Sequence, residues 1–223
     1  MEMIAFTPLL LRALVTTIWL SWLALLLAAL GGVALALLRT SRYAPLRVAS
    51  LLFVEFFRSI PILIVMFFCY FGVPVVLGVD VSTFAAATAA LALQASAAMS
   101  EVVRAGILSV GKGQWEAAQS SGMSYVQVMR YIVGPQAGRV ILPPSVGIYI
   151  ATLKESALAS IIGVIELTKT GLLIRESTGA GLSALSAVAL LYFAMNYGIS
   201  QAGGVLERRL AVGSARPIEG AAA

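Results

Sequence analysis

Long apolar segments alternate with shorter polar ones along this chain, and the pattern predicts membrane-spanning helices. Five apolar runs approach or exceed the length that a helix needs to cross a bilayer, about 20 residues. They lack the strict alternation of a strand, and backbone inside a bilayer must satisfy its hydrogen bonds within a helix or a closed barrel. We therefore expect an all-α integral membrane protein with five transmembrane helices, at about 16–38, 49–71, 83–108, 136–153 and 182–206.

Breakers and small residues refine this picture. The second span is expected to end at Gly72, Pro74 and Gly78. The third, 83–108, is rich in alanine and other small residues, as close helix packing in lipid requires. A further short helix is predicted at 160–170, outside the membrane or re-entrant in it.

One long polar interval, 111–135, predicts a helical hairpin between the third and fourth spans. Its first helix should end at Gly122, because glycine adopts the left-handed cap conformation at little cost. Ser124 and Gln127 have the spacing of a capping box, which predicts that a second helix starts next. Pro135 either stops that helix or marks the entrance to the fourth span.

The hairpin is predicted to be amphipathic. Val126, Met129 and Val133 recur at the spacing of one helical face. Glu116 lies in the first turn of the first helix, where the helix dipole favours a carboxylate by about 0.3–1 kcal/mol. An amphipathic hairpin between two membrane-length segments is suited to dock on a partner in the aqueous phase.

The basic residues predict the orientation of the chain. Only Arg12, Lys169 and Arg175 fall on one side of the five spans, whereas ten basic residues fall on the other. Because basic loops stay in the cytoplasm, we expect the hairpin and C-terminus to be cytoplasmic and the N-terminus to be outside. The ten are Arg39, Arg42, Arg47, Arg104, Lys112, Arg130, Arg139, Arg208, Arg209 and Arg216.

Composition supports the membrane assignment and excludes several functions. The 223 residues are 60% hydrophobic and 11% charged, and the mean hydropathy is +0.97. The net charge of +5 is spread over the ends of the spans, so a nucleic-acid partner is not expected. Cys69 is the only cysteine and histidine is absent, which excludes an intrachain disulfide, a thiol-rich metal site and a histidine-based triad.

A near-match to a phosphate-binding loop lies at 106–113, GILSVGKG. Gly113 stands where the motif has the hydroxyl residue that holds Mg²⁺, and the run follows a membrane helix instead of a strand. We expect no cofactor on this chain. If ATP powers the protein, a separate subunit binds ATP and magnesium.

The hairpin resembles the EAA loop in the permease subunits of bacterial ABC importers. The flanking sequences GILSVGKGQWEAA and LKESALASIIGVIELT look like the polar amino acid branch of that family, and the resemblance spans roughly residues 11–209. Gly134 departs from the pattern, since the family usually has leucine there. The residues that carry the resemblance are Glu116, Ala117, Ala118, Gly122, Ile132 and Pro135.

This resemblance implies a transport subunit without enzymatic activity of its own. The hairpin would insert in a groove on an ABC ATPase, and two ATPase copies, a second permease subunit and an external solute-binding protein would complete the importer. A polar amino acid would cross the bacterial inner membrane by alternating access. The residues expected to couple to the ATPase are Trp115, Glu116, Ala117, Ala118, Gly122 and Arg130.

Ionisable side chains within the spans are candidates for the substrate path, because they are costly in lipid and usually face a bundle interior. Glu55 and Arg58 lie three residues apart, so they are either path residues or a pair that neutralises itself. Glu101 is a further path candidate, and with Arg104 it forms either part of the path or an interfacial pair.

Gln94 and the segment 154–156 complete the predicted path. Gln94 lies deep in the third span, and the resemblance implies that the substrate path runs past it; the alternative is an interhelical hydrogen bond. Lys154, Glu155 and Ser156 end the fourth span, and groups of both signs suit a zwitterion. The alternative for Lys154 and Glu155 is a pair at the membrane surface that needs no ligand.

Two other classes of membrane protein are alternatives to the importer. A self-sufficient small secondary transporter should show paired interrupted helices in two related halves, and a channel should show rings of charge or a filter loop. Neither pattern is evident in the sequence. An intramembrane enzyme would lack histidine and paired intramembrane aspartates, the usual catalytic groups.

Overall fold

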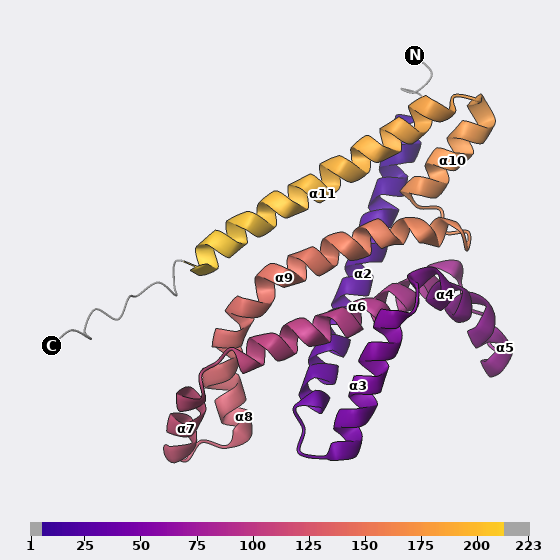
Figure 1. The fold of residues 1–223 in the computed structure, drawn as a ribbon. Coiled ribbons are helices and arrows are strands. Elements are labelled where there is room, and N and C mark those ends of the chain that lie inside the picture. Colours follow the sequence, from indigo (N-terminus) through magenta and orange to yellow (C-terminus); the bar gives the residue numbers. More distant parts are fainter. Residues whose placement is uncertain (1–5, 212–223) are drawn as a thin grey trace.

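A computed structural model describes residues 6–211, and every regular element in that range is helical. Long helices form the body of the molecule, and a small helical hairpin lies at one end of it (Figure 1). The predicted all-helical class is therefore confirmed. The helices are α2 (Thr7–Arg39), α3 (Ala44–Ser59), α4 (Ile62–Phe67), α5 (Val73–Leu77), α6 (Thr83–Leu108), α7 (Lys112–Ser120), α8 (Tyr125–Val128), α9 (Gly134–Glu155), α10 (Leu167–Thr178) and α11 (Gly181–Ala211), with π-helical turns η1 (Phe68–Gly72) and η2 (Met129–Val133) and the 3₁₀ turn η3 (Ser156–Ser160).

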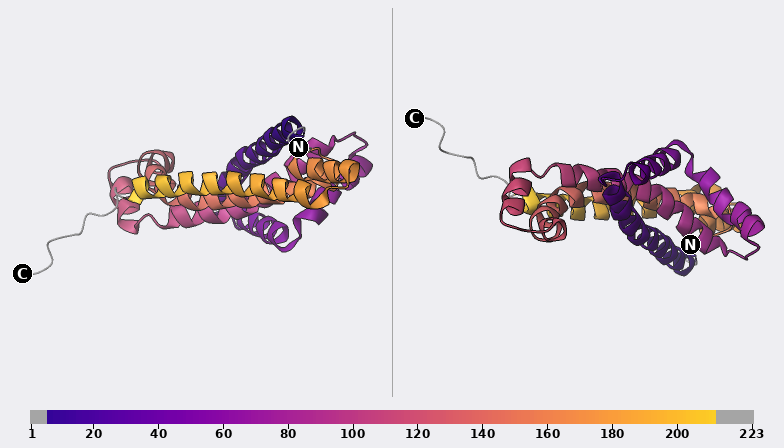
Figure 2. Two further views of the ribbon diagram at one scale, coloured as in Figure 1. Left: turned by 90° about the horizontal axis from the view of Figure 1, so that it is seen from above. Right: turned by 90° about the horizontal axis from the view of Figure 1, so that it is seen from below.

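Helices α2 and α6 form the most extensive helix pair of the bundle. Seen from above and from below, α2 crosses the bundle at an angle, whereas α11 runs along its length beside α9 (Figure 2). A β-carbon on Gly31 would lie 2.5 Å from Ser96 Oγ, and one on Gly32 would lie 2.6 Å from the Met99 side chain. Small residues therefore let the two backbones approach closely, as expected for helices packed in lipid.

The second predicted span is broken, which corrects the single helix expected over 49–71. Helix α3 ends at Ser59, and the helical segment that follows, Ile62–Leu77, is turned from it by 107°. Ile60 is extended with ψ 135°, because Pro61 disfavours a helical conformation in the residue before it. Pro74 does not end the segment, since it lies in the first turn of α5, where a missing N–H is tolerated.

The remaining boundaries differ in smaller ways. The first span lies within the longer helix α2, and the fourth and fifth lie within α9 and α11. The short helix expected at 160–170 is wrong in place, because Gly163 has φ +98° in a turn and α10 begins only after Glu166, which caps it. The segment 160–170 is therefore mostly turn, and the helix follows it.

Length and apolar composition identify fewer spans than the five predicted. Within the described residues, three helices are long and apolar enough to cross a membrane, α2, α6 and most of α11, and the bent pair of segments from Ala44 to Leu77 makes a fourth if it counts as one span. Helix α9 carries Arg139, Lys154 and Glu155 and is not among them. The five-span topology therefore stays a prediction, and Arg216, used to predict the orientation, lies outside the described residues.

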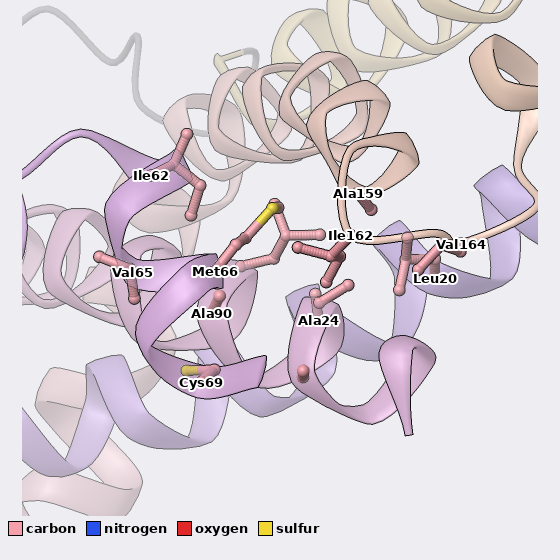
Figure 3. Packing of buried hydrophobic residues seen from close by; sticks show 13 residues of the cluster. Leu20, Ala24, Ile62, Val65, Met66, Cys69, Ala90, Ala159, Ile162 and Val164 are labelled. Atoms are coloured by element: carbon pink, nitrogen blue, oxygen red, sulfur yellow. The ribbon is translucent and has the colours of Figure 1, made fainter. Parts of the chain in front are cut away.

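One apolar core fixes the bend (Figure 3). Leu20 and Ala24 from α2, Met66 from α4, Ala90 from α6 and Ile162 from the turn after η3 pack together. Leu20, Ala24, Met66 and Ala90 have no exposed surface. Because four segments that are distant in the sequence meet here, this core holds α4 against α6 after the chain has turned at Pro61.

Candidate functional site

The hairpin predicted at 111–135 is present, with the turn chemistry that the sequence indicated. Helix α7 ends before Gly122, which has φ +80°. The Ser124 backbone N–H donates to Gln127 Oε1 at 2.8 Å, and the Gln127 backbone N–H donates to Ser124 Oγ at 3.4 Å, which completes the capping box. Pro135 does not stop the second helix, because it lies in the first turn of α9 and the helix runs on through η2.

The apolar face of the second hairpin helix differs from the predicted stripe. Val126 is 71% exposed and Val128 is fully buried in its place, whereas Val133 is buried as expected. The π-helical turn η2 accommodates one extra residue, so the regular spacing from Val126 to Val133 does not hold. Gly134 permits this turn, since a β-carbon there would lie 2.7 Å from the Met129 carbonyl oxygen.

The inner face of the hairpin is fastened to the ends of α6 and α9. Ala118 and Val128 pack with Val103 and Ile107 of α6 and with Ala137 of α9, all of them buried. Ala118 therefore anchors the hairpin from within and is not available to a partner. A load on the hairpin would be transmitted to both long helices, because they share this packed core.

The outer face presents the other predicted coupling residues. Glu116 and Ala117 are exposed, and nothing lies within 4 Å of a β-carbon built on Gly122. The expected place of Glu116 in the first turn is wrong, because α7 begins earlier, at Lys112. Trp115 is half-buried, and its ring centroid lies 6.0 Å from that of Tyr125, so an aromatic pair joins the two hairpin helices. Arg130 is also exposed, and its guanidinium carbon lies 5.6 Å from the centroid of the Tyr131 ring.

A cluster of charges lies behind the hairpin, centred on Glu101 of α6. Arg39 from the end of α2 contacts Glu101 Oε1, and Arg104 contacts Oε2 at 3.1 Å. Arg58 of α3 lies 3.9 Å from Glu101 and 3.9 Å from Glu55. We call these five residues the Glu101 cluster. It joins the ends of α2 and α3 to α6 through one carboxylate.

Burial decides which contacts of the Glu101 cluster matter. The side chains of Arg39 and Glu101 are 13% and 25% exposed, whereas those of Arg58 and Glu55 are 50% and 56% exposed. Exposed ion pairs contribute about 0–1 kcal/mol, so the Arg39–Glu101 pair is the principal contact. Both pairs proposed from the sequence are present, but Arg39 was missed because it lies 62 residues from its partner. The sequence offered one signal for this pair. Arg39 is a basic residue at the end of one apolar span, and Glu101 is a carboxylate within another.

The structure separates the predicted substrate-path residues into two groups. Glu55, Arg58 and Glu101 belong to the cluster near the hairpin, whereas Glu155 ends α9, which starts at the hairpin and rises about 33 Å over its 22 residues. Within the described residues no salt bridge joins Lys154 to Glu155, and the membrane-surface pair considered as the alternative for these two residues stays a prediction. Ser156 is buried and donates to the Leu153 carbonyl oxygen at 2.7 Å.

Gln94 lies between the two groups on α6, and its Oε1 atom is enclosed without a hydrogen-bond partner among the described residues. The interhelical hydrogen bond considered for this side chain is therefore not seen for that oxygen. A buried carbonyl oxygen without a donor is costly. Gln94 thus offers an unused acceptor in the interior of the bundle.

One buried carboxylate was missed by the sequence analysis. Glu166 has no exposed surface, and it accepts hydrogen bonds from the backbone N–H groups of Thr168 at 2.9 Å and Lys169 at 2.7 Å and from the Tyr192 hydroxyl at 2.8 Å. Burial raises the pKa of Glu166, although these donors act in the opposite direction. Next to it, the Leu167 N–H donates to Thr17 Oγ1 at 3.0 Å. Glu166 therefore caps α10 and links it to α11, and the neighbouring Leu167 links α10 to α2.

Comparison with known proteins agrees with this arrangement. Residues 28–212 match the family described as "Binding-protein-dependent transport system inner membrane component". The "Probable glutamine ABC transporter permease protein GlnP" of Bacillus subtilis (strain 168) is 36% identical over 196 residues, which cover 86% of this chain and 89% of that protein. The "L-cystine transport system permease protein TcyL" of the same organism is 35% identical over 196 residues, 85% of this chain and 82% of that protein.

Solved structures share the fold. A chain described as "Crystal structure of an amino acid ABC transporter with histidines" has a TM-score of 0.86 and 35% identity, covering 93% of this chain and 97% of that chain. A chain of the MetNI methionine ABC transporter in an inward-facing conformation has a TM-score of 0.76 and 22% identity, which supports the fold alone. The family match covers most of the chain, and the helices of the chain fit a multi-pass membrane protein. The relatives of the chain are named as permeases and not as ATPases. The chain therefore belongs to the binding-protein-dependent transport system inner membrane components, the permease subunits of ABC transporters.

Proposed function

We propose that this chain is the transmembrane subunit of an ATP-driven importer for a polar amino acid. The observation that carries the proposal is the hairpin. It exposes Glu116, Ala117 and Gly122 at one end of the bundle, and its inner face packs into α6 and α9. Relatives named as amino acid ABC transporter permeases supply the substrate class.

Partners follow from this assignment. Two copies of an ABC ATPase bind the hairpins. ATP and magnesium are bound by these ATPase subunits, so this chain holds no cofactor. A second permease subunit, identical or homologous, pairs with it in the bacterial inner membrane, and a solute-binding protein delivers the amino acid from outside. The hairpin and the C-terminus face the cytoplasm, as the distribution of basic residues predicts.

Transport requires no reaction on this chain. Closure of the ATPases moves the hairpins, and the shared core around Ala118 and Val128 passes that movement to α6 and α9 as rigid bodies. The path opens to one side and then to the other. Of the predicted path residues outside the Glu101 cluster, Ser156 already donates to the Leu153 carbonyl oxygen, whereas Gln94 and Glu155 are half-buried, and we propose that Gln94 and Glu155 meet the zwitterion. No observation favours a self-sufficient transporter or a channel.

Gly122→Trp tests the proposal. The variant places an indole where the native hairpin offers open space, so ATPase docking and ATP-driven uptake in proteoliposomes should be lost. Gly179→Trp is the matched control, because Gly179 also has a positive φ, +69°, and open space beyond its α-carbon, but it ends α10 away from the hairpin. Uptake by Gly122→Trp at the level of Gly179→Trp, with equal membrane levels, would overturn the proposal.

A further inference from the structure

A cavity of about 620 Å³ lies between the hairpin and the turn that joins α2 to α3. The turn contributes Arg42 and Tyr43, and the hairpin contributes Trp115, Gln119 and Tyr125. Figure 1 shows this turn and the hairpin at the same end of the bundle. We call this space the turn–hairpin cavity. It is separate from the Glu101 cluster and from the exposed edge of the hairpin around Gly122.

The two walls of the turn–hairpin cavity come from segments that are far apart in the sequence. The turn is held to α2 and α3, where Ser50 Oγ donates to the Leu35 carbonyl oxygen at 2.9 Å. The hairpin is held to α6 and α9 through Ala118 and Val128, and Ala36 of α2 belongs to the same core. A partner that fills the cavity would therefore contact the hairpin and the α2–α3 turn at once.

The chemistry of the cavity fits an acidic protein segment. The charged side chains of residues 40–47 and 109–131 are Arg42, Arg47, Lys112, Arg130 and Glu116, all of them exposed, so this end carries a surplus of positive charge. Charge complementarity calls for a negatively charged partner. The aromatic walls, which are amphipathic, suit an apolar side chain beside the acid, since aromatic residues are enriched in protein interfaces.

A protein partner fits better than a lipid phosphate. Phosphate sites usually combine several cationic donors, and Arg42 is the only cation among the residues that line this cavity. Trp115 and Gln119 lie on α7 on either side of Glu116, one helical turn or less away. A macromolecule bound to Glu116 therefore reaches the cavity as well.

We propose that the turn–hairpin cavity is a second docking contact for the ATPase subunit, which places an acidic side chain beside Arg42 and an apolar one against Trp115 and Tyr125. This inference rests on the proposed function and extends it from the hairpin to the α2–α3 turn. Docking at two places connects the ATPase to α2 as well as to α6 and α9, so closure of the ATPases moves all three helices.

Charge reversal at Arg42 tests the inference, with Arg47 as the matched control. Both arginines are exposed and only five residues apart, but Arg47 does not line the cavity. The full-length variants are placed in nanodiscs of neutral lipid, and binding of the purified ATPase is titrated. Arg42→Glu should weaken binding about tenfold, because an ion pair is lost and a repulsion is gained, while Arg47→Glu should change it less than about twofold. Arg42→Gln should give an intermediate loss, and all three should match the parent in thermal stability.

The outcomes separate the alternatives. Equal effects of Arg42→Glu and Arg47→Glu, or no effect of either, would overturn the inference. If the parent needs anionic lipid for ATPase binding and Arg42→Glu abolishes that need, a lipid headgroup occupies the cavity and the inference is again overturned. Gly122→Trp is measured alongside. If it binds the ATPase as the parent does, the proposed function itself fails, whereas its loss of binding with intact binding by Arg42→Glu rejects only the second contact.

Discussion

Replacing Glu101 by glutamine removes the charge at the centre of the Glu101 cluster and keeps the shape of the side chain. Three guanidinium groups then lose their common partner, and Arg39, only 13% exposed, is left as a largely buried cation. A hydrogen bond to a charged group contributes about 1.5–3 kcal/mol, and each of the more exposed contacts, to Arg104 and Arg58, contributes about 0.2–1 kcal/mol. We expect Glu101→Gln to lower the free energy of unfolding by about 2–5 kcal/mol.

Thermal unfolding in detergent measures this loss. A destabilisation of that size in a chain of this length lowers the unfolding temperature by roughly 4–20 °C. Glu55→Gln is the matched control, because Glu55 lies 3.9 Å from the same Arg58 but is 56% exposed, and it should shift the unfolding temperature by no more than about 4 °C.

A double-mutant cycle isolates the principal contact. Arg39→Gln, Glu101→Gln and the double variant should give a coupling free energy of at least about 1 kcal/mol, whereas the corresponding cycle with Arg58 should give less than about 0.5 kcal/mol. If Glu101→Gln proves no more destabilising than Glu55→Gln, or if the Arg39 cycle shows no coupling, the reasoning from burial is refuted.

Two further predictions concern other parts of the fold. Burial raises the folded pKa of Glu166 above the 4.5 of an exposed glutamate, so between these two values the folded chain binds more protons than the unfolded chain. Stability should therefore fall as pH rises from 4.5 through the raised value. Unfolding temperatures measured against pH should show this slope in the parent and a shallower one in Glu166→Gln, and equal slopes would contradict the prediction. Gly32→Val should lower the free energy of unfolding by about 1–3 kcal/mol in the same thermal assay, because a β-carbon at this position would lie 2.6 Å from Met99. Gly198→Val, with open space around it, should lower it little. Equal losses of stability would contradict close packing where α2 crosses α6.

Local chemistry explains which parts of the hairpin were predictable. The Gly122 turn and the Ser124–Gln127 capping box depend on residues within four positions of one another, so their residue types alone indicate the structure. The buried face was not predictable in the same way. It depends on the π-helical turn at Met129–Val133, which a regular helical spacing does not anticipate.

Contacts between distant segments account for the other differences. Pro61 is visible in the sequence, but a proline inside an apolar run can kink a span or end it, and the 107° bend is fixed by the core around Met66. The Arg39–Glu101 pair joins residues 62 positions apart, and no local pattern links them. Glu166 falls inside the short helix predicted over 160–170, and nothing in its local sequence marks it as a buried carboxylate. Only the packing of α10 against α11 brings Tyr192 to it.

By itself, the sequence determined that the chain is helical and built for a membrane, because long apolar runs without the alternation of a strand satisfy their backbone hydrogen bonds in lipid as helices. It also determined the hairpin, whose turns follow from short-range chemistry. Tertiary structure alone decided which charges meet, where the second span bends and which hairpin residues face inward. These depend on how helices from distant parts of the chain pack, and a side chain's partners are set by that packing and not by its neighbours in sequence.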